Sequence, residues 1–465
     1  MVTGSRKLGL TVTVLVLLAA VVAVAALRPF GGAPRPDIIV IVVDTLRPDH
    51  LGCYGSTLDT SPNVDALAAD SMFFEDCRAH APNTRMSMAS VFSGFLPHET
   101  NVVKQTDLTD KVETLAEQLI PLGYTTAAVI SNFVLRKGVG FDQGFMVYDD
   151  EMKESEQTRK LAERTAEPTT DRAIELLRKY KDEQLFMWIH YQDPHGPYTP
   201  PPGYGERMKQ PGRQPRLLPV TLTNDGLGGI PRYQRLGEHR DYHHYVANYN
   251  GEIRHFDEHF GRLIAALKEL GYYDDALIIF TSDHGEGMGE QNWYFAHGTY
   301  LYSSITRVPL MLRYGDRLPK VRRTQMAQHL DIMPTIRGIL ELANDRGYRG
   351  RDLRGPLASG PEVFAEARPG KDGKRRVSLI ADGMKLIVMP VVNGQDRLEL
   401  YDLNEDPYEA HDLGVLEQYE ATRNALALRV NEIMQEDRLG IELVGAQRPR
   451  TKEELEKLKD IGYSQ

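Results

Sequence analysis

The sequence has little cysteine and no excess of positive charge, and each absence excludes a class of protein. Cys53 and Cys77 are the only cysteines among 465 residues, so they cannot form a structural zinc site by themselves. We expect two semi-buried free thiols, or one disulfide if the domain lies outside the cytoplasm. The net charge of −10 provides no basic face, so we expect no nucleic-acid partner.

The N-terminus carries an uninterrupted apolar run. Residues 8–27 contain no charged side chain and follow Arg6 and Lys7. A run of about 20 residues matches the thickness of a bilayer, and it is longer than a usual signal-peptide core of about 7–15 residues. We therefore predict a cytoplasmic N-terminus at 1–7, a single-pass membrane anchor at 8–27 and an extracytoplasmic catalytic domain. The alternative is a cleaved signal and a secreted or periplasmic protein.

The rest of the chain alternates between strand-like and helix-like segments. After a linker at 28–36, the run DIIVIVV is apolar throughout, as expected of a strand buried on both faces of a sheet. Similar runs occur at 125–131, 185–190, 277–282 and 308–313, and helical patterns occur at 63–71, 157–180 and 254–271. This alternation predicts an α/β fold with a doubly wound, mostly parallel sheet, over a catalytic domain at 37–370.

Two segments depart from this alternation. Residues 200–243 are rich in proline and glycine, which predicts a long surface insertion of the kind that often recognises substrate. From about residue 371 to 465 we predict a small α+β subdomain, with antiparallel strands at 375–390 and 397–403 and a helix at 415–438. The sequence shows no internal repeats.

Acids and imidazoles follow three of the predicted strands. Asp44 follows the first, Asp283 and His284 follow the run at 277–282, and His195 follows the run at 185–190. Ligands of open α/β sheets bind at the carboxyl ends of the strands. Two carboxylates and an imidazole predict one divalent metal ion, with Zn²⁺ or Mn²⁺ preferred and Ca²⁺ as a further candidate.

Several motifs resemble the sulfatase family of the alkaline phosphatase superfamily. They are DIIVIVVDTLRPDHLGCYG (37–55), APNTRMSMASVFSG (81–94), DPHGPY (193–198), TSDHGE (281–286), ITRVPLMLR (305–313) and LYDLNEDPYEAHDL (400–413). The family pattern C-x-P-S-R-x-x-L-x-T-G, aligned on Gly94, places Thr84 at the nucleophile position. Threonine cannot become formylglycine, and Met86 and Met88 replace the Pro and Arg of the pattern.

The resemblance implies roles for the remaining residues. With Thr84, the set Asp44, Asp283 and His284 resembles the metal sites of phosphonate monoester hydrolases, lipoteichoic-acid synthases and phosphoethanolamine transferases. Family position implies that His195 contacts leaving-group or non-bridging oxygens. It implies that His297 donates a hydrogen bond to the transferred group or protonates the leaving group. A helix suggested by residues 87–94 would point its N-terminus at the same oxyanion.

Other polar residues are weaker candidates. Arg85 either steadies a phosphate oxygen or is structural, since neighbouring side chains diverge. Asn132 ends a strand, Arg307 fits a structural role at a strand start, and His190 and the histidines of 243–245 fit core or solvated positions.

Three functions remain open at this stage. The first is a metal-dependent hydrolase of phosphate or phosphonate esters, or a phospho-head-group transferase, with Thr84 as nucleophile. The second is a sulfuric ester hydrolase that works without formylglycine, and the third is a catalytically silent binding protein. The expected partner is an anionic ester substrate, linked to a lipid or a glycan; the oligomeric state is undetermined.

Overall fold

The computed structural model describes residues 35–102, 106–156, 158–357, 360–368, 374–391, 394 and 396–439. The predicted cytoplasmic segment and the predicted anchor at 8–27 lie outside these ranges, as does most of the linker at 28–36. Within the described ranges, no helix combines the length and the apolarity that a membrane crossing needs. The described residues from Asp37 onward form one compact unit.

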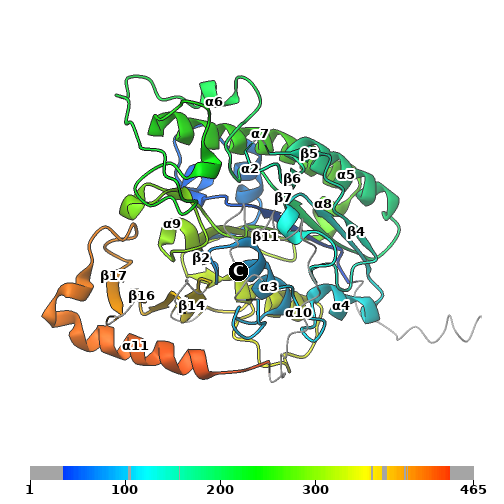
Figure 1. The fold of residues 1–465 in the computed structure, drawn as a ribbon. Coiled ribbons are helices and arrows are strands. Elements are labelled where there is room, and N and C mark those ends of the chain that lie inside the picture. The colour runs from blue at the N-terminus through cyan, green and yellow to red at the C-terminus, as the bar shows by residue number, and fades with distance from the viewer. Residues whose placement is uncertain are drawn as a thin grey trace, which may run out of the picture. The chain divides into compact units, whose positions relative to one another are not determined.

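A nine-stranded sheet forms the centre of this unit (Figure 1). Its strands are β1 (Ile38–Val43), β2 (Met72–Arg78), β3 (Thr125–Ile130), β4 (Val147–Asp149), β7 (Leu185–Tyr191), β8 (Leu277–Ser282), β11 (Arg307–Arg313), β12 (Val321–Arg323) and β13 (Ala327–Gln328). Their order is β12-β2-β11-β8-β1-β7-β3-β4, with β13 also paired to β2. β1 lies between β7 and β8 and is parallel to both, whereas β11 is antiparallel to β8 and β2.

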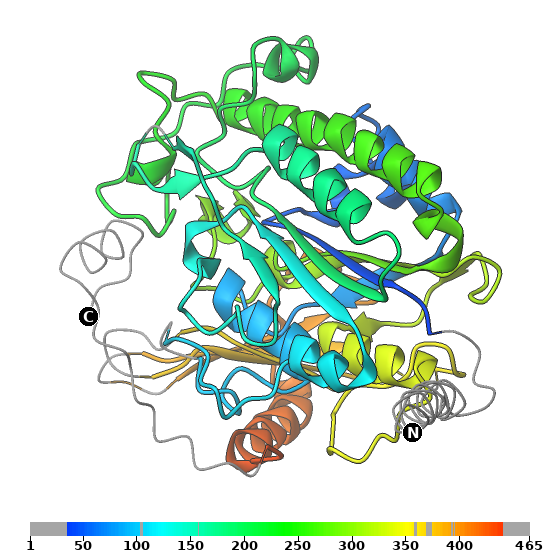
Figure 2. The same cartoon turned by 90° about the vertical axis from the view of Figure 1, so that its right-hand side faces the viewer.

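Helices cover both faces of the sheet. On one face lie α2 (Pro62–Ala69), α5 (Ala166–Lys179), α7 (Tyr242–Glu269) and α8 (Tyr272–Asp275), and on the other lie α3 (Thr84–Ser93), α4 (Leu115–Leu119) and α10 (Ile332–Ile339) (Figures 1 and 2). Alternate residues of β1 enter the two separate cores, Val40 on the α3 side and Ile41 on the α7 side. Burying each such side chain contributes about 1.5–3 kcal/mol, which explains why the run is apolar at every position. The predicted α/β fold is confirmed.

One predicted helix begins later than its sequence pattern suggested. The pattern at 157–180 yields a helix only from Ala166, because Ala162–Glu163 form strand β6, which pairs with β5 (Glu154–Ser155). Pro168 explains this start. Proline lacks an N–H and clashes with the preceding turn, so a helix tolerates it only in its first turn.

The predicted insertion at 200–243 is only partly a surface feature. It contains the short helix α6 (Tyr204–Arg207), and it leads into α7, which begins at Tyr242 with Asp241 as its N-cap. Leu222 is exposed, but Ile230 and Gln234 are fully buried. The segment therefore supplies part of the core beside α7 as well as exposed loop.

The C-terminal region contains a second, antiparallel sheet of β14 (Val363–Glu366), β15 (Val377–Ala381), β16 (Met384–Met389) and β17 (Arg397–Asp402). Helix α11 (Glu420–Gln435) contacts β15 and β16. This confirms the predicted α+β character, and the sheet already begins at β14, before residue 371. The Lys385 ammonium on β16 contacts Glu409 Oε1 at 2.6 Å, and Glu409 also accepts a hydrogen bond from the backbone N–H of Ser303 at the start of α9 (Ser303–Thr306).

Candidate active site

Three buried side chains lie at the carboxyl ends of β1 and β8. The two strands are parallel neighbours in a register that pairs Val43 with Ser282, so the residues that follow them emerge side by side. Asp44, Asp283 and His284 are all completely buried there. Their ligand atoms lie within 4.8 Å of one another. The geometry thus brings together the three residues that the sequence proposed as metal ligands.

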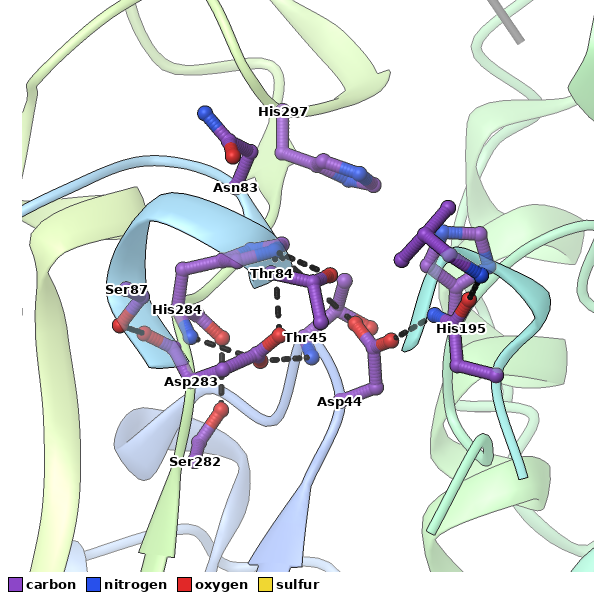
Figure 3. Close-up of polar contacts among 12 residues, drawn as sticks. Asp44, Thr45, Asn83, Thr84, Ser87, His195, Ser282, Asp283, His284 and His297 are labelled. Carbon is purple, nitrogen blue, oxygen red and sulfur yellow. Dashed lines mark hydrogen bonds and ion pairs between the residues drawn. The ribbon is translucent and has the colours of Figure 1, made fainter. Parts of the chain in front are cut away.

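The side chain of Thr84 lies against this group (Figure 3). The Oγ1 atom of Thr84 is 3.5 Å from Nε2 of His284. The same Nε2 atom is 3.4 Å from Oδ2 of Asp283 and 3.9 Å from Oδ1 of Asp44. One hydroxyl, two carboxylates and one imidazole therefore share a small, buried space.

The donor set fits a divalent cation. In the described part of the chain, Oδ1 of Asp44 and Oδ2 of Asp283 are buried without a hydrogen-bond partner, although buried polar atoms are normally satisfied. His284 Nδ1 lies 2.9 Å from the carbonyl of Gly285, so it donates there and leaves the lone pair of Nε2 directed at the carboxylates. Burial, followed by the neighbouring Asp283, raises the pKa of Asp44 well above its usual value. A bound cation would remove this repulsion and satisfy the unpartnered atoms.

Helix α3 positions the threonine. The side chain of Asn83 caps the helix by accepting a hydrogen bond from the backbone N–H of Met86, and Thr84 is the first helical residue. Ser87 Oγ donates to the carbonyl of Asp283 at 2.7 Å and so ties the first turn to β8. The free N–H groups and the dipole at a helix N-terminus favour an anion, so negative charge that develops beside Thr84 is stabilised.

Two further histidines lie close to this group. The ring of His297 is 4.5 Å from that of His284 and 5.1 Å from that of His195, measured between centroids. Nδ1 of His297 is 3.1 Å from Oε1 of the fully buried Glu286, whose other oxygen accepts a hydrogen bond from the hydroxyl of Tyr198. This carboxylate fixes the orientation of His297.

The tautomer of His195 follows from its contacts. Nε2 of Gln192 lies 3.1 Å from Nδ1 of His195, and because the amide nitrogen can only donate, Nδ1 accepts and the ring proton sits on Nε2. Burial, followed by the charge of His297, holds the pKa of His195 well below its ordinary value. His195 is therefore a neutral donor at neutral pH.

A pocket of roughly 640 Å³ of empty space, open to solvent, adjoins these residues. Its wall includes polar side chains and a few apolar ones: Asn83, Thr84, Asn132, Phe133, Val134, Glu156, Arg159, Leu161, Glu163, Gln192, His195, His297 and Arg368. Arg159 forms an ion pair with Glu156 at 2.6 Å. Burial raises the pKa of Glu163 to about 8. The pocket therefore leads from solvent to Thr84 and presents mostly polar side chains.

Other residues named from the sequence lie in structural positions. Arg85 is 1 % exposed and donates through Nε to the carbonyl of Val134 at 2.6 Å, so it holds α3 in place. Arg307 starts β11 and donates to the carbonyl of Glu75.

The other histidines and the cysteines named from the sequence also lie in structural positions. His190 lies in the core beside Trp188, and the histidines of 243–245 fall in the first turn of α7. Cys53 and Cys77 are both unpaired, which confirms the expectation of free thiols.

The structure adds residues that sequence reasoning did not single out. Asn83 caps the helix, Glu286 holds His297 and Gln192 holds His195. Glu286 lies inside the motif TSDHGE, so its place in that motif could have identified it as a candidate site residue. Asn132, considered only weakly from sequence, donates to Oδ2 of Asp44 at 2.5 Å and orients that carboxylate.

Comparisons with known proteins identify the family and the fold. The family model described as Sulfatase matches residues 36–342. An N-acetylglucosamine-6-O-sulfatase of Bacteroides thetaiotaomicron is 24% identical, with 82% of each chain covered, and an arylsulfatase of Clostridium perfringens is 23% identical, with 83% of this chain and 91% of the relative covered. The phosphonate monoester hydrolase of Agrobacterium radiobacter shares the fold, with a TM-score of 0.70, 22% identity and coverage of 86% and 95% of the two chains. With the family model matched over most of the chain, the protein belongs to the sulfatase family, within the alkaline phosphatase superfamily, and is an ester-bond hydrolase.

Proposed function

We propose that this hydrolase cleaves phosphate or phosphonate esters and uses Thr84 as its nucleophile. The observation that carries the proposal is the position of Thr84 Oγ1, 3.5 Å from His284 Nε2 at the N-terminus of α3. Threonine cannot be oxidised to formylglycine, so a sulfated Thr84 would lack the elimination route of a hydrated aldehyde. A phosphorylated Thr84 needs no such route, because water can attack its phosphorus directly.

The residues that would hold a divalent cation are Asp44, Asp283 and His284, with Thr84 as a fourth candidate ligand. Zn²⁺ and Mn²⁺ suit this mixed oxygen and nitrogen set best, and Ca²⁺ is a further candidate. When bound, such a cation lowers the pKa of a contacting hydroxyl and neutralises charge on the phosphoryl oxygens.

The reaction has two displacements at phosphorus. Thr84 Oγ1 gives its proton to solvent and forms a bond to phosphorus, while the bond from phosphorus to the leaving oxygen breaks and that oxygen takes a proton from His297. Water then attacks the phosphothreonine and gives a proton to His297. The bond from phosphorus to Thr84 Oγ1 breaks, and this oxygen regains a proton from solvent, which restores the hydroxyl. An acceptor alcohol in place of water would make the same site a transferase.

The two pocket histidines supply hydrogen bonds and protons. His195, with its proton on Nε2, donates to a non-bridging or leaving-group oxygen. His297, held by Glu286, exchanges a proton with the leaving group. Groups of this kind contribute about 10²- to 10⁴-fold to rate. The N-terminus of α3 stabilises charge that builds on the phosphoryl oxygens.

The names of the relatives favour one alternative. The N-acetylglucosamine-6-O-sulfatase and the arylsulfatase both carry names that describe sulfatases, so hydrolysis of a sulfuric ester by Thr84 itself is the second candidate activity. In both cases we propose an anionic ester attached to a glycan or a lipid. We also propose that the catalytic unit works outside the cytoplasm, exported through residues 8–27.

The test compares esters and variants in the full chain. Aryl phosphate, phosphodiester, phosphonate and sulfate substrates are assayed with Zn²⁺, Mn²⁺ or Ca²⁺. We expect Thr84→Ala to lower kcat/KM by about 10³-fold or more and Thr84→Ser to retain measurable turnover. Ser90→Ala, which removes a hydroxyl later in the same helix, is the matched control and should change little.

Rapid acid quenching during turnover provides a direct readout. We expect mass spectrometry to find a phosphoryl group on the peptide that contains Thr84, and to find none in Thr84→Ala. A preference for sulfate esters would support the alternative activity. Turnover that survives both Thr84→Ala and metal chelation would disprove both candidates.

A further inference from the structure

A second group of buried ligand atoms lies apart from Thr84. Asp193 follows β7, and Glu252 and His255 lie one turn apart on α7, a spacing that places both on one helix face. One ligand atom from each of the three residues lies within 4.8 Å of the other two. Exposure of the three residues is only 6 %, 6 % and 7 %. None of them contributes to the roles described above.

Two atoms of this group have no hydrogen-bond partner among the described residues, namely Oδ2 of Asp193 and Nδ1 of His255. Nδ1 of His255 faces Asp193, with 3.6 Å to Oδ1. The other ring nitrogen, Nε2, lies 3.1 Å from Nε2 of His259, so His259 fixes the ring with Nδ1 toward the acids. Buried polar atoms are rarely left unsatisfied, which points to a missing ligand.

The charges around the group favour a cation. Within the described ranges, no lysine or arginine forms an ion pair with Asp193 or Glu252. Burial, followed by the charge of Asp193 and a side-chain hydrogen bond with that residue, raises the pKa of Glu252 well above its usual value, and Glu163 adds further negative charge. Burying two adjacent carboxylates is costly unless a proton or a cation lies between them.

We propose that Asp193, Glu252 and His255 bind a second divalent cation, separate from the Asp44, Asp283 and His284 group. Two carboxylates and one imidazole suit Zn²⁺ or Mn²⁺ and leave at least one coordination position for water. Binding through Nδ1 places the ring proton of His255 on Nε2, where it is donated to Nε2 of His259. Arg262, whose side chain is 45% exposed and donates to Nδ1 of His259 at 3.0 Å, then turns away from that nitrogen.

The cation would join two parts of the fold. Asp193 belongs to the loop that carries His195, whereas Glu252 and His255 belong to the long helix α7. Binding therefore fastens the His195 loop to the helix layer. This inference does not depend on whether the ester is a phosphate or a sulfate.

The experiment counts and locates metal in the full chain. Protein purified without chelator is equilibrated with Zn²⁺ or Mn²⁺, washed free of excess ion and analysed by mass spectrometry for metal per chain. We expect two ions per chain in the unaltered protein. His255→Ala and Glu252→Gln should each lower this number to one, and so should Asp283→Asn through loss of the other site.

A matched control lies on the same helix. Glu258→Gln removes a carboxylate from the more exposed face of α7, and we expect it to keep two ions. Anomalous diffraction at the metal edge locates the ions without any substitution, so the test holds even if a variant fails to fold. We expect one peak between Asp193 and His255.

Two results would overturn the proposal. The first is one ion per chain with no anomalous peak at Asp193 in the metal-equilibrated crystal. The second is an infrared band of a protonated carboxylic acid that persists in the metal-equilibrated protein and disappears in Glu252→Gln, because a proton shared by Asp193 and Glu252 would then occupy the place assigned to the cation.

Discussion

The side-chain amide of Asn132 donates a hydrogen bond to Oδ2 of Asp44 at 2.5 Å and leaves Oδ1 of the same carboxylate unpartnered. The two residues follow β3 and β1, which are separated in the sheet by β7. This bond lowers the pKa of Asp44 against the effects of burial and of Asp283. Asn132 thus orients a buried carboxylate and opposes part of the rise in its pKa, and both effects favour metal binding.

Replacement of Asn132 is expected to weaken metal binding. Outer hydrogen-bond partners of ligands typically contribute about 10- to 100-fold to affinity, so Asn132→Ala should raise the Kd for Zn²⁺ by about that factor. Competition with a chromogenic chelator measures it. Gln118→Ala, which removes another buried amide and its bond to Tyr348, should leave the Kd unchanged. An unchanged Kd in Asn132→Ala would contradict the role of Asn132 in positioning Asp44 for the cation.

Glu286 is expected to act on turnover through His297. Glu286→Gln removes the charge that faces Nδ1 of His297 at 3.1 Å, and kcat should fall by about 10- to 100-fold with little change in KM. Tyr198→Phe, which removes only the hydroxyl on the other oxygen of Glu286, should have a smaller effect. In a His297→Ala background, Glu286→Gln should add almost nothing. Full additivity would show that Glu286 acts independently of His297.

Stability is expected to fall in acid partly because of His80. Burial lowers the pKa of this histidine from 6.5 to about 4, although Nδ1 donates to the carbonyl of Phe364. A histidine with a lowered pKa in the folded state resists protonation, so its stabilising contribution is present above pH 6.5 and is lost as pH falls toward 4. At 1.36 kcal/mol per pKa unit, the loss is about 3 kcal/mol.

Urea unfolding at several pH values tests this dependence. Between pH 6.5 and 4, the free energy of unfolding should fall by about 3 kcal/mol less in His80→Gln than in the unaltered protein. Substitution of the exposed His411 by Gln serves as control and should leave the dependence of the free energy of unfolding on pH unchanged. Equal slopes for His80→Gln and the unaltered protein would contradict the assignment.

The buried pair of Lys385 and Glu409 is expected to hold the C-terminal sheet to α9. Both side chains are essentially inaccessible, so Lys385→Met leaves a carboxylate buried without its cation. The free energy of unfolding should fall by about 3–5 kcal/mol. The double variant Lys385→Met with Glu409→Leu should recover part of this loss, because no lone charge remains. A loss below about 1 kcal/mol would match an exposed pair and contradict the role.

Much of the fold and of the candidate site follows from local sequence. The run at 38–43 is apolar at every position, which only a strand covered on both faces requires. Parallel strands end at one edge of their sheet, so the sequence alone predicts that Asp44 and Asp283 lie together. The resemblance to the sulfatase pattern, aligned on Gly94, placed Thr84 at the nucleophile position, and helix α3 does end at Gly94, with a φ of 79°.

Tertiary structure decided what depends on residues far apart in the chain. The antiparallel direction of β11 depends on its pairing with β8 and β2, which are distant in sequence. The burial of Arg85 likewise depends on residues that are not part of the local sequence around it. The same holds for the bond from Asn132 to Asp44 and the contact of Glu286 with His297. The grouping of Asp193 with Glu252 and His255 arises only when α7 packs beside β7. Local sequence therefore determined which groups stand at the sheet edge, whereas packing decided which atoms are left without partners, and unpartnered atoms are what a metal ion binds.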